Sequence, residues 1–161
     1  MSRNRRPLLA VAVSLLVLVE LALLSSAFAS TRAYTFYFFR GPGGNVVCGY
    51  FAGGGAGSGT PYLECGVKSV LSPAPPRPTS AACGNLDFAN NRVRLRPTGR
   101  VQGFCSGDVG VLAELGSAHP LRYGGTWRKG AFACTSTRAW LTCNNGDRHG
   151  FALSRGHWRS F

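Results

Sequence analysis

The hydrophobic positions after residue 30 fall into short runs that are rich in aromatic and β-branched residues and are separated by glycine and proline. No run keeps the 3.6-residue apolar spacing of an amphipathic helix. Many short strands with turn residues between them predict an all-β fold, either a small antiparallel sandwich or an open barrel. Residues 111–115 fit either a strand or a single helical turn. We expect strands at residues 34–39, 46–51, 61–67, 92–96, 101–105, 126–128, 131–136, 139–143 and 151–154.

Two segments between these runs fit connections. Residues 53–59 are glycine apart from one alanine and one serine, which is typical of a flexible hairpin tip. They lack the lysine and hydroxyl residue of a phosphate-binding loop. Residues 72–78 contain four prolines and fit a stiff, extended connector on the outside of a domain.

Residues 92–96 alternate between arginine and apolar residues, which is the pattern of a half-buried strand. We expect Val93 and Leu95 to face inward and the three arginines to face outward. This stripe, extended by the arginine of the following turn, is the best candidate for an anion contact. Protection of an edge strand against aggregation explains the same pattern. The candidate residues are Arg92, Arg94, Arg96 and Arg100.

The first 29 residues have the pattern of a secretory signal helix. Three arginines precede an apolar run from Leu8 to Leu24, and Ala27-Phe28-Ala29 supplies the small residues of a cleavage site. Cleavage after Ala29 leaves residues 30–161 as a single exported domain, which reaches the cell envelope or the medium. The alternative is an uncleaved anchor, since the 17 residues from Leu8 to Leu24 lie at the short limit of a membrane span. Contact with a membrane is expected only through this segment.

All six cysteines lie in the predicted exported domain. An even number of cysteines behind an export signal indicates disulfides. Each consecutive pair brackets a hairpin or a short excursion, so we predict that neighbours pair along the chain. There is no C-x-x-C, and the spacings do not repeat a zinc-ligand pair. The predicted disulfides are Cys48–Cys65, Cys83–Cys105 and Cys134–Cys143.

The chain is strongly basic. Its formal charge is +12, and removing the three arginines and one glutamate of the signal segment leaves 15 basic and 5 acidic residues, a charge of +10. A basic surface attracts polyanions such as teichoic or uronic polymers and acidic lipid headgroups. Because the charges are scattered, a general arginine bias explains them as well. Nucleic acid is not expected as a physiological ligand of an exported chain.

A set of ordered motifs resembles a known family. The motifs are F-R-G-P-G-G-N-V-V-C at 39–48, P-P-R-P at 75–78, C-S-G-D at 105–108, L-R-Y-G at 121–124 and T-C-N-N-G-D-R-H-G-F-A-L-S-R at 142–155. Together they resemble a family of small bacterial, actinobacterial-type secreted six-cysteine domains of unknown function. The resemblance implies an exported, disulfide-bonded domain without an assigned activity. This chain departs from it at Gly41 and Gly43, where the family has serine, at Trp140, where it has glycine, and at Arg148, where it has glycine before the histidine.

Catalytic chemistry has weak support in the sequence. His149, Ser154 and Asp108 contain the atoms of a hydrolase triad, but no G-x-S-x-G elbow is present. We interpret His149 and Gly150 as turn residues and Asp108 as a turn-capping carboxylate that Arg155 could pair with. The three histidines do not have metal-ligand spacing, so neither a metal nor a cofactor is expected. The sequence favours a non-catalytic domain that binds anionic envelope material or a protein partner. The alternative is a small extracellular hydrolase centred on His149.

Overall fold

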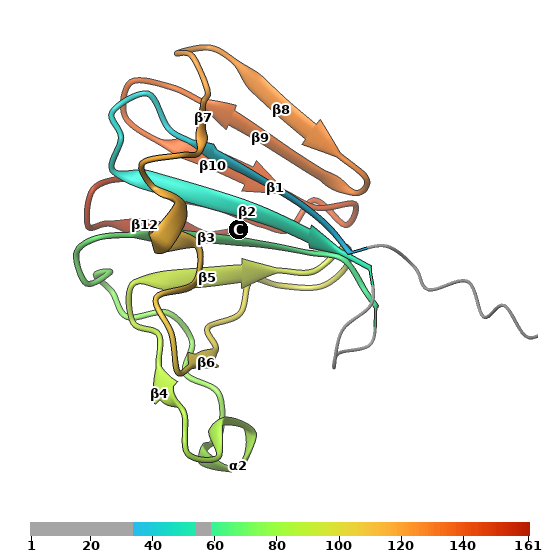
Figure 1. Ribbon diagram of the computed structural model, residues 1–161, viewed down its shortest axis with the longest axis vertical. Helices are drawn as coiled ribbons and strands as arrows, with labels where there is room; N and C mark the ends of the chain where they lie inside the picture. Colours follow the sequence, from blue (N-terminus) through green and yellow to red (C-terminus); the bar gives the residue numbers. More distant parts are fainter. Residues whose placement is uncertain (1–33, 54–58) are drawn as a thin grey trace, which may run out of the picture. The chain divides into compact units, whose positions relative to one another are not determined.

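All but one of the predicted strands lie in two five-stranded β-sheets in the computed structural model, which describes residues 34–53 and 59–161. The strand predicted at residues 101–105 is wrong, because Gln102 makes only an isolated bridge to Arg94 and Cys105 begins a separate two-residue strand. The first sheet has the order β5-β3-β2-β1-β7, and its β7 pairs with β1 in parallel while its other pairs are antiparallel (Figure 1). Its strands are β1 (Thr35–Arg40), β2 (Val46–Ala52), β3 (Tyr62–Val67), β5 (Arg92–Leu95) and β7 (His119–Pro120).

The second sheet is an antiparallel meander in which every strand pairs with its neighbour in sequence, in the order β12-β11-β10-β9-β8. Its last strand lies beyond residues 151–154, the last strand that we predicted. The sequence gives no alternation long enough to indicate this three-residue strand. The strands are β8 (Thr126–Lys129), β9 (Phe132–Ser136), β10 (Leu141–Asn144), β11 (Gly150–Leu153) and β12 (Trp158–Ser160).

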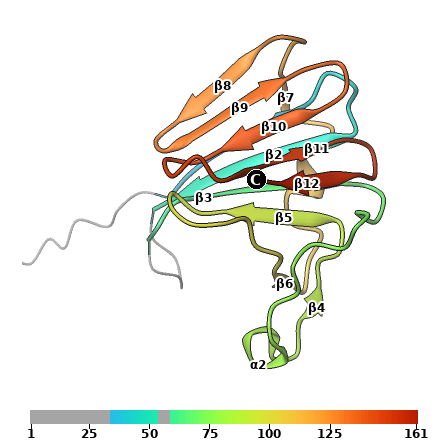
Figure 2. The same ribbon diagram turned by 180° about the vertical axis from the view of Figure 1, so that it is seen from behind.

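The two sheets pack face to face and share one apolar core, so the all-β sandwich expected from the sequence is confirmed. Figure 1 shows the first sheet in front of the second, and Figure 2 shows the reverse. Phe39 and Leu63 of the first sheet and Phe132 and Phe151 of the second belong to the same buried cluster. The Trp127 ring stacks on Phe39 with 4.6 Å between ring centroids. Burying such rings between two sheets is the main source of stability in this architecture.

The disulfides are those predicted from the sequence. Cys48–Cys65 joins β2 to β3, and Cys134–Cys143 joins β9 to β10. In both bridges the cysteines lie directly opposite each other on neighbouring strands, and all four are fully buried. Cys83–Cys105 joins α2 (Ser80–Cys83) to β6 (Cys105–Ser106). Each bridge restricts the unfolded chain and contributes roughly 2–4 kcal/mol.

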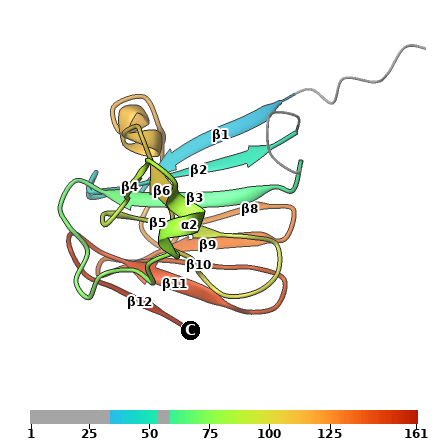
Figure 3. The ribbon, with the colours of Figure 1, turned by 90° about the horizontal axis from the view of Figure 1, so that it is seen from below.

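A long excursion between β3 and β5 carries the proline-rich connector. The Trp158 indole N–H donates to the Pro73 carbonyl at 2.6 Å, which ties the connector to the last strand. Beyond it, α2 and the two-stranded pair of β4 (Asp87–Phe88) and β6 project from the sandwich (Figures 1 and 3). The alternative left open at residues 111–115 is resolved as a helical turn, the 3₁₀ helix η2 (Gly110–Glu114).

Residues from Ala33 to Phe161 pack as one unit. The predicted signal segment, its cleavage site and most of the glycine-rich tip lie outside the described residues. In the part of the chain that the structure describes, no helix has the length and apolar character needed to cross a bilayer.

Candidate functional site

The predicted arginine stripe is only partly at the surface. Val93 and Leu95 face the core as expected, and both are fully buried. The outward orientation predicted for the arginines is wrong for Arg92, which is 3% exposed. The face of β5 that carries Arg92 and Arg94 is covered by residues 104–112, so it is not a solvent face.

Glu64 neutralises both covered arginines. Its Oε1 accepts from Arg92 Nη1 and its Oε2 from Arg94 Nη2, each at 3.0 Å. The carboxylate is 4% exposed, and the Phe104 ring lies 3.9 Å from the Arg94 guanidinium carbon and 5.1 Å from that of Arg92. Because Arg92 is buried and paired, it is removed from any surface that an anionic polymer contacts.

Two glycines make room for this ion pair. A side chain at Gly66 would meet Arg92 Cγ at 2.7 Å, and one at Gly110 would meet Arg92 Nη1 at 1.8 Å. The Arg92 guanidinium also donates to the Asp108 carbonyl at 2.7 Å. These contacts make the buried part of the stripe a structural element of the first sheet.

Arg96 and Arg100 remain exposed, at the turn that follows β5. This turn is held from the second sheet, because the Asn145 side-chain amide donates to the Arg96 and Gly99 carbonyls at 3.0 and 2.8 Å. The Asp147 carboxylate accepts from the Gly99 N–H at 2.8 Å. The two exposed arginines are therefore on a rigid turn, and neither belongs to the lining of the cavity described below.

Asp108 caps the turn before η2, in the role expected from the sequence. Its Oδ1 accepts from Ser106 Oγ at 2.7 Å and from the Gly110 N–H at 3.0 Å. The Ser106 hydrogen bond is the main reason why the pKa of Asp108 lies below its ordinary value. The proposed pairing with Arg155 is wrong, because the cation near Asp108 is Arg92, with Nη1 3.7 Å from Oδ1.

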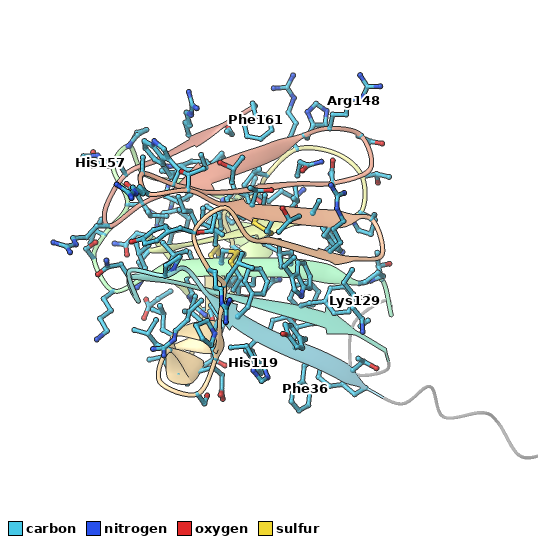
Figure 4. All side chains as sticks on the ribbon, turned by 90° about the horizontal axis from the view of Figure 1, so that it is seen from above. Phe36, His119, Lys129, Arg148, His157 and Phe161 are labelled. Carbon is cyan, nitrogen blue, oxygen red and sulfur yellow. A yellow bond between two sulfur atoms is a disulfide. The ribbon has the colours of Figure 1, made fainter. Side chains whose placement is uncertain are left out.

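The atoms of the considered hydrolase triad are not brought together. His149 precedes β11 and Ser154 follows it, so they lie at opposite ends of the strand, roughly 17 Å apart at the rise of an extended chain. Figure 4 shows their neighbours Arg148 and His157 at opposite ends of the second sheet. Asp108 hydrogen-bonds within its own turn. These residues therefore share no site.

In the turn before β11, the close approach predicted at Gly150 is present, and His149 contributes its backbone carbonyl. The His149 carbonyl accepts from the Asn145 N–H at 2.9 Å. Gly150 is needed for close approach, because a side chain there would meet the Cys143 carbonyl oxygen at 2.1 Å. The positive φ of this turn is at Arg148 instead, at 66°.

A cavity of about 370 Å³ lies where turns from both sheets meet. The β1–β2, β9–β10 and β11–β12 turns stand at the same end of the sandwich in both views (Figures 1 and 2). Buried Val46, Leu141 and Leu153 contribute apolar surface to it. The polar and aromatic residues of the lining include Asn45, Tyr123, Ser136, Arg138, Trp140 and Arg155.

Hydrogen bonds hold the turns around this cavity. In the β9–β10 turn, the Thr137 N–H donates to the Trp140 carbonyl at 2.8 Å. The Thr137 hydroxyl donates to the same carbonyl and accepts from the Trp140 N–H. In the β1–β2 turn, the Gly41 N–H donates to the Val46 carbonyl at 2.9 Å. The Ser69 hydroxyl donates to the Arg155 carbonyl. The lining is thus positioned before any ligand arrives.

The cavity is electropositive. Arg138 and Arg155 line it from different turns, and both are exposed. Neither has an ion-pair partner within residues 34–53 and 59–161, and none of the carboxylates there belongs to the lining. Two uncompensated guanidinium groups beside an apolar wall favour a ligand with a negative group.

One buried hydroxyl in the lining lacks a protein partner. Ser136 is 1% exposed, and its Oγ makes no hydrogen bond within the described chain. Its backbone is fixed, because its N–H donates to the Gly125 carbonyl at 3.0 Å. An unpaired buried hydroxyl is unfavourable, so a hydrogen-bond partner that reached it would be stabilising.

Sequence reasoning missed this cavity and Arg138, and it named Arg155 only as a partner for Asp108. The turns that form it are distant in sequence, and their arginines look like ordinary solvated charges. Gly41, Gly43 and Trp140, three of the departures from the resembled pattern, are in the lining, but only the structure brings them together.

The sulfur atoms of Cys48, Cys65 and Cys143 form the one group in the described residues that has the spacing of metal ligands, all within 4.8 Å of one another. Each of these sulfurs belongs to a disulfide, so it is not a thiolate that can bind a metal ion.

Comparison with known proteins identifies a family whose function is unknown. The model of a family of unknown function, DUF6636, matches residues 15–161. No curated protein and no solved structure matches the chain.

Proposed function

Because the chain belongs to the DUF6636 family, for which no function is given, we propose a function from its cavity. The domain is a non-catalytic binding module that holds an anionic group of cell-envelope material between the β1–β2, β9–β10 and β11–β12 turns. Arg138 and Arg155 attract the negative group, and Trp140 and Tyr123 contact the rest of the ligand.

One observation carries this function: two arginines line the cavity and no carboxylate does. By contrast, the buried Arg92 and the partly buried Arg94 share a carboxylate partner in Glu64. Cations that are left unpaired at a concave apolar site are available to a ligand, and the site raises the local concentration of anions.

The expected export of the domain supports an envelope ligand. Three disulfides are compatible with an oxidising compartment, and the sequence begins with the pattern of a secretory signal. Anionic polymers are the ligands that such a basic domain meets outside the cytosol. Catalysis by His149 is not part of this function, since His149 and Ser154 lie at opposite ends of β11.

Salt-dependent retention on an immobilised anionic polymer tests the function. Arg138→Ser/Arg155→Ser removes two charges from the cavity, and Arg96→Ser/Arg100→Ser removes two exposed charges that are outside its lining. We expect the cavity variant to elute at a clearly lower salt concentration than the control variant. If the two variants elute at the same salt concentration, total charge alone causes retention, and the proposed function is refuted.

A further inference from the structure

We propose, on the basis of the function given above, that the ligand in the cavity is a carboxylated sugar ring, a hexuronic acid unit of an anionic polysaccharide. The lining combines aromatic rings, two arginines and a buried hydroxyl without a partner. These three kinds of group correspond to the three parts of a hexuronate: the apolar face of its ring, its carboxylate and its hydroxyls.

Trp140 supplies the surface for the ring. Its backbone is fixed by the Thr137 contacts, and the Arg159 guanidinium carbon lies 5.8 Å over the indole. The indole is half-buried, so part of it is free for a ligand, and Tyr123, also in the lining, is 56% exposed. Amphipathic rings of this kind combine apolar contact with little loss of conformational entropy on binding.

The two arginines match a carboxylate. A guanidinium is planar and presents parallel N–H donors, which fit the two oxygens of a carboxylate. Arg138 and Arg155 reach the cavity from the β9–β10 and β11–β12 turns. A neutral sugar leaves both charges without a partner and is therefore expected to bind weakly.

Ser136 matches a sugar hydroxyl. Its Oγ both donates and accepts, and it is buried in a wall that is otherwise apolar, beside Leu141 and Leu153. Its pairing with a ligand hydroxyl removes the cost of an unsatisfied buried group. The amide of Asn45, on the β1–β2 turn, adds a second polar group to the lining.

The size of the cavity limits how much of a polysaccharide enters. A volume of about 370 Å³ is near the lower limit of small-molecule sites. It suits one or two sugar units, with the rest of the polymer outside. A nucleotide also offers a flat ring and a negative group, and a glycerol phosphate polymer offers the negative group alone. Both are therefore alternatives that the test has to include.

Calorimetric titration of the oxidised protein separates these ligands. The probes are trigalacturonate, the uncharged galactose trisaccharide, a glycerol phosphate oligomer and AMP. We expect trigalacturonate to bind at least about tenfold more tightly than each of the others, because it alone combines a carboxylate, an apolar sugar face and ring hydroxyls on one unit. Equal or tighter binding of the glycerol phosphate oligomer or AMP refutes the hexuronate assignment.

Variants show whether the bound sugar lies in the cavity. Ser136→Ala and Trp140→Ala are each expected to weaken trigalacturonate about tenfold, whereas Trp140→Phe, which keeps a ring, weakens it less. Unchanged affinity in the two alanine variants, with native circular dichroism, refutes this mode of recognition. If these tests fail while Arg138→Ser/Arg155→Ser still elutes from the anionic column at a lower salt concentration than Arg96→Ser/Arg100→Ser, only the hexuronate assignment is lost. If that difference is absent too, the proposed function is also lost.

Discussion

The Sγ atoms of Cys65 and Cys143 lie within 4.8 Å of each other, although they belong to different disulfides in different sheets. Cys65 is on β3 and Cys143 is on β10, and Cys48 Sγ belongs to the same group. Both bridges are fully buried between the sheets. The centre of the sandwich therefore contains two neighbouring disulfides from facing strands, each within reach of a sulfur of the other.

This contact predicts disulfide exchange in a variant with one free thiol. In Cys134→Ser, the Cys143 thiolate attacks Cys48 or Cys65, a new bond forms between the sheets, and the displaced sulfur leaves as a thiolate that takes up a proton. We expect peptide mapping after incubation at alkaline pH to find Cys143 bonded to Cys48 or Cys65.

Cys105→Ser is the matched control, because the cysteine that it frees, Cys83, lies in the projecting excursion. Both core disulfides are expected to stay intact in this variant. An unchanged Cys48–Cys65 bond in every molecule of Cys134→Ser would show that the buried sulfurs do not react with each other.

The contact between Glu64 and Arg92 predicts a large loss of stability in Glu64→Gln. The substitution keeps the shape of the side chain but leaves Arg92, whose side chain is 4% exposed, without its buried counter-charge. Breaking one partner of a buried pair costs about 3–5 kcal/mol. Urea unfolding measures this loss, and Asp108→Asn, which removes the exposed partner of Arg92, should lower the free energy of unfolding by less than about 1 kcal/mol. Similar losses in the two variants would contradict the assignment of Glu64.

The sequence predicted what depends on neighbouring residues. The alternation of arginine and apolar residues at 92–96 placed Val93 and Leu95 in the core. Pairing each cysteine with its neighbour in the sequence was sufficient to predict the three disulfides. Alternation and the two hairpin disulfides, Cys48–Cys65 and Cys134–Cys143, are local properties, because a strand alternates between two faces and a hairpin brings its own ends together. Cys83–Cys105 encloses β4 and β5 instead of a hairpin. The same reasoning failed for Arg92, since the residues that cover it come from a later segment, 104–112.

The cavity could not be predicted for the same reason. Its lining comes from turns around residues 41–46, 123, 136–141 and 153–155, which meet only because the two sheets face each other. Ser136 has the sequence context of any serine in a strand, and only its burial without a partner distinguishes it. Turn chemistry predicts where a chain reverses, but not which reversals become neighbours.

The Ser106–Asp108 hydrogen bond predicts a pH effect of defined sign. The bond lowers the pKa of Asp108 in the folded state, so its stabilisation is present above the unfolded pKa, about 3.9, and is lost as the pH falls through the folded pKa. Ser106→Ala should raise the pKa of Asp108, which carboxyl NMR titration measures. Ser117→Ala is the control, since it removes a serine hydroxyl that bonds to Glu114 instead. An unchanged Asp108 titration in Ser106→Ala would show that Ser106 does not hold this carboxylate.

Arg148 is the one non-glycine residue with positive φ in the described part of the chain, at 66°. Its N–H donates to the Asn145 carbonyl at 3.1 Å, so the turn holds it in this conformation. The left-handed region costs an ordinary residue about 1–2 kcal/mol, and glycine avoids this cost but loses roughly 0.5–1 kcal/mol through its greater freedom when unfolded. Arg148→Gly is therefore expected to raise the free energy of unfolding by about 0.5–1 kcal/mol in urea titration. The control is Arg100→Gly, at an exposed arginine that lies in a turn but does not itself have a positive φ. It should lower the free energy of unfolding, because glycine gives the unfolded chain more freedom and relieves no strain in the folded state. Equal destabilisation of the two variants would mean that the positive φ of Arg148 carries no strain that glycine relieves.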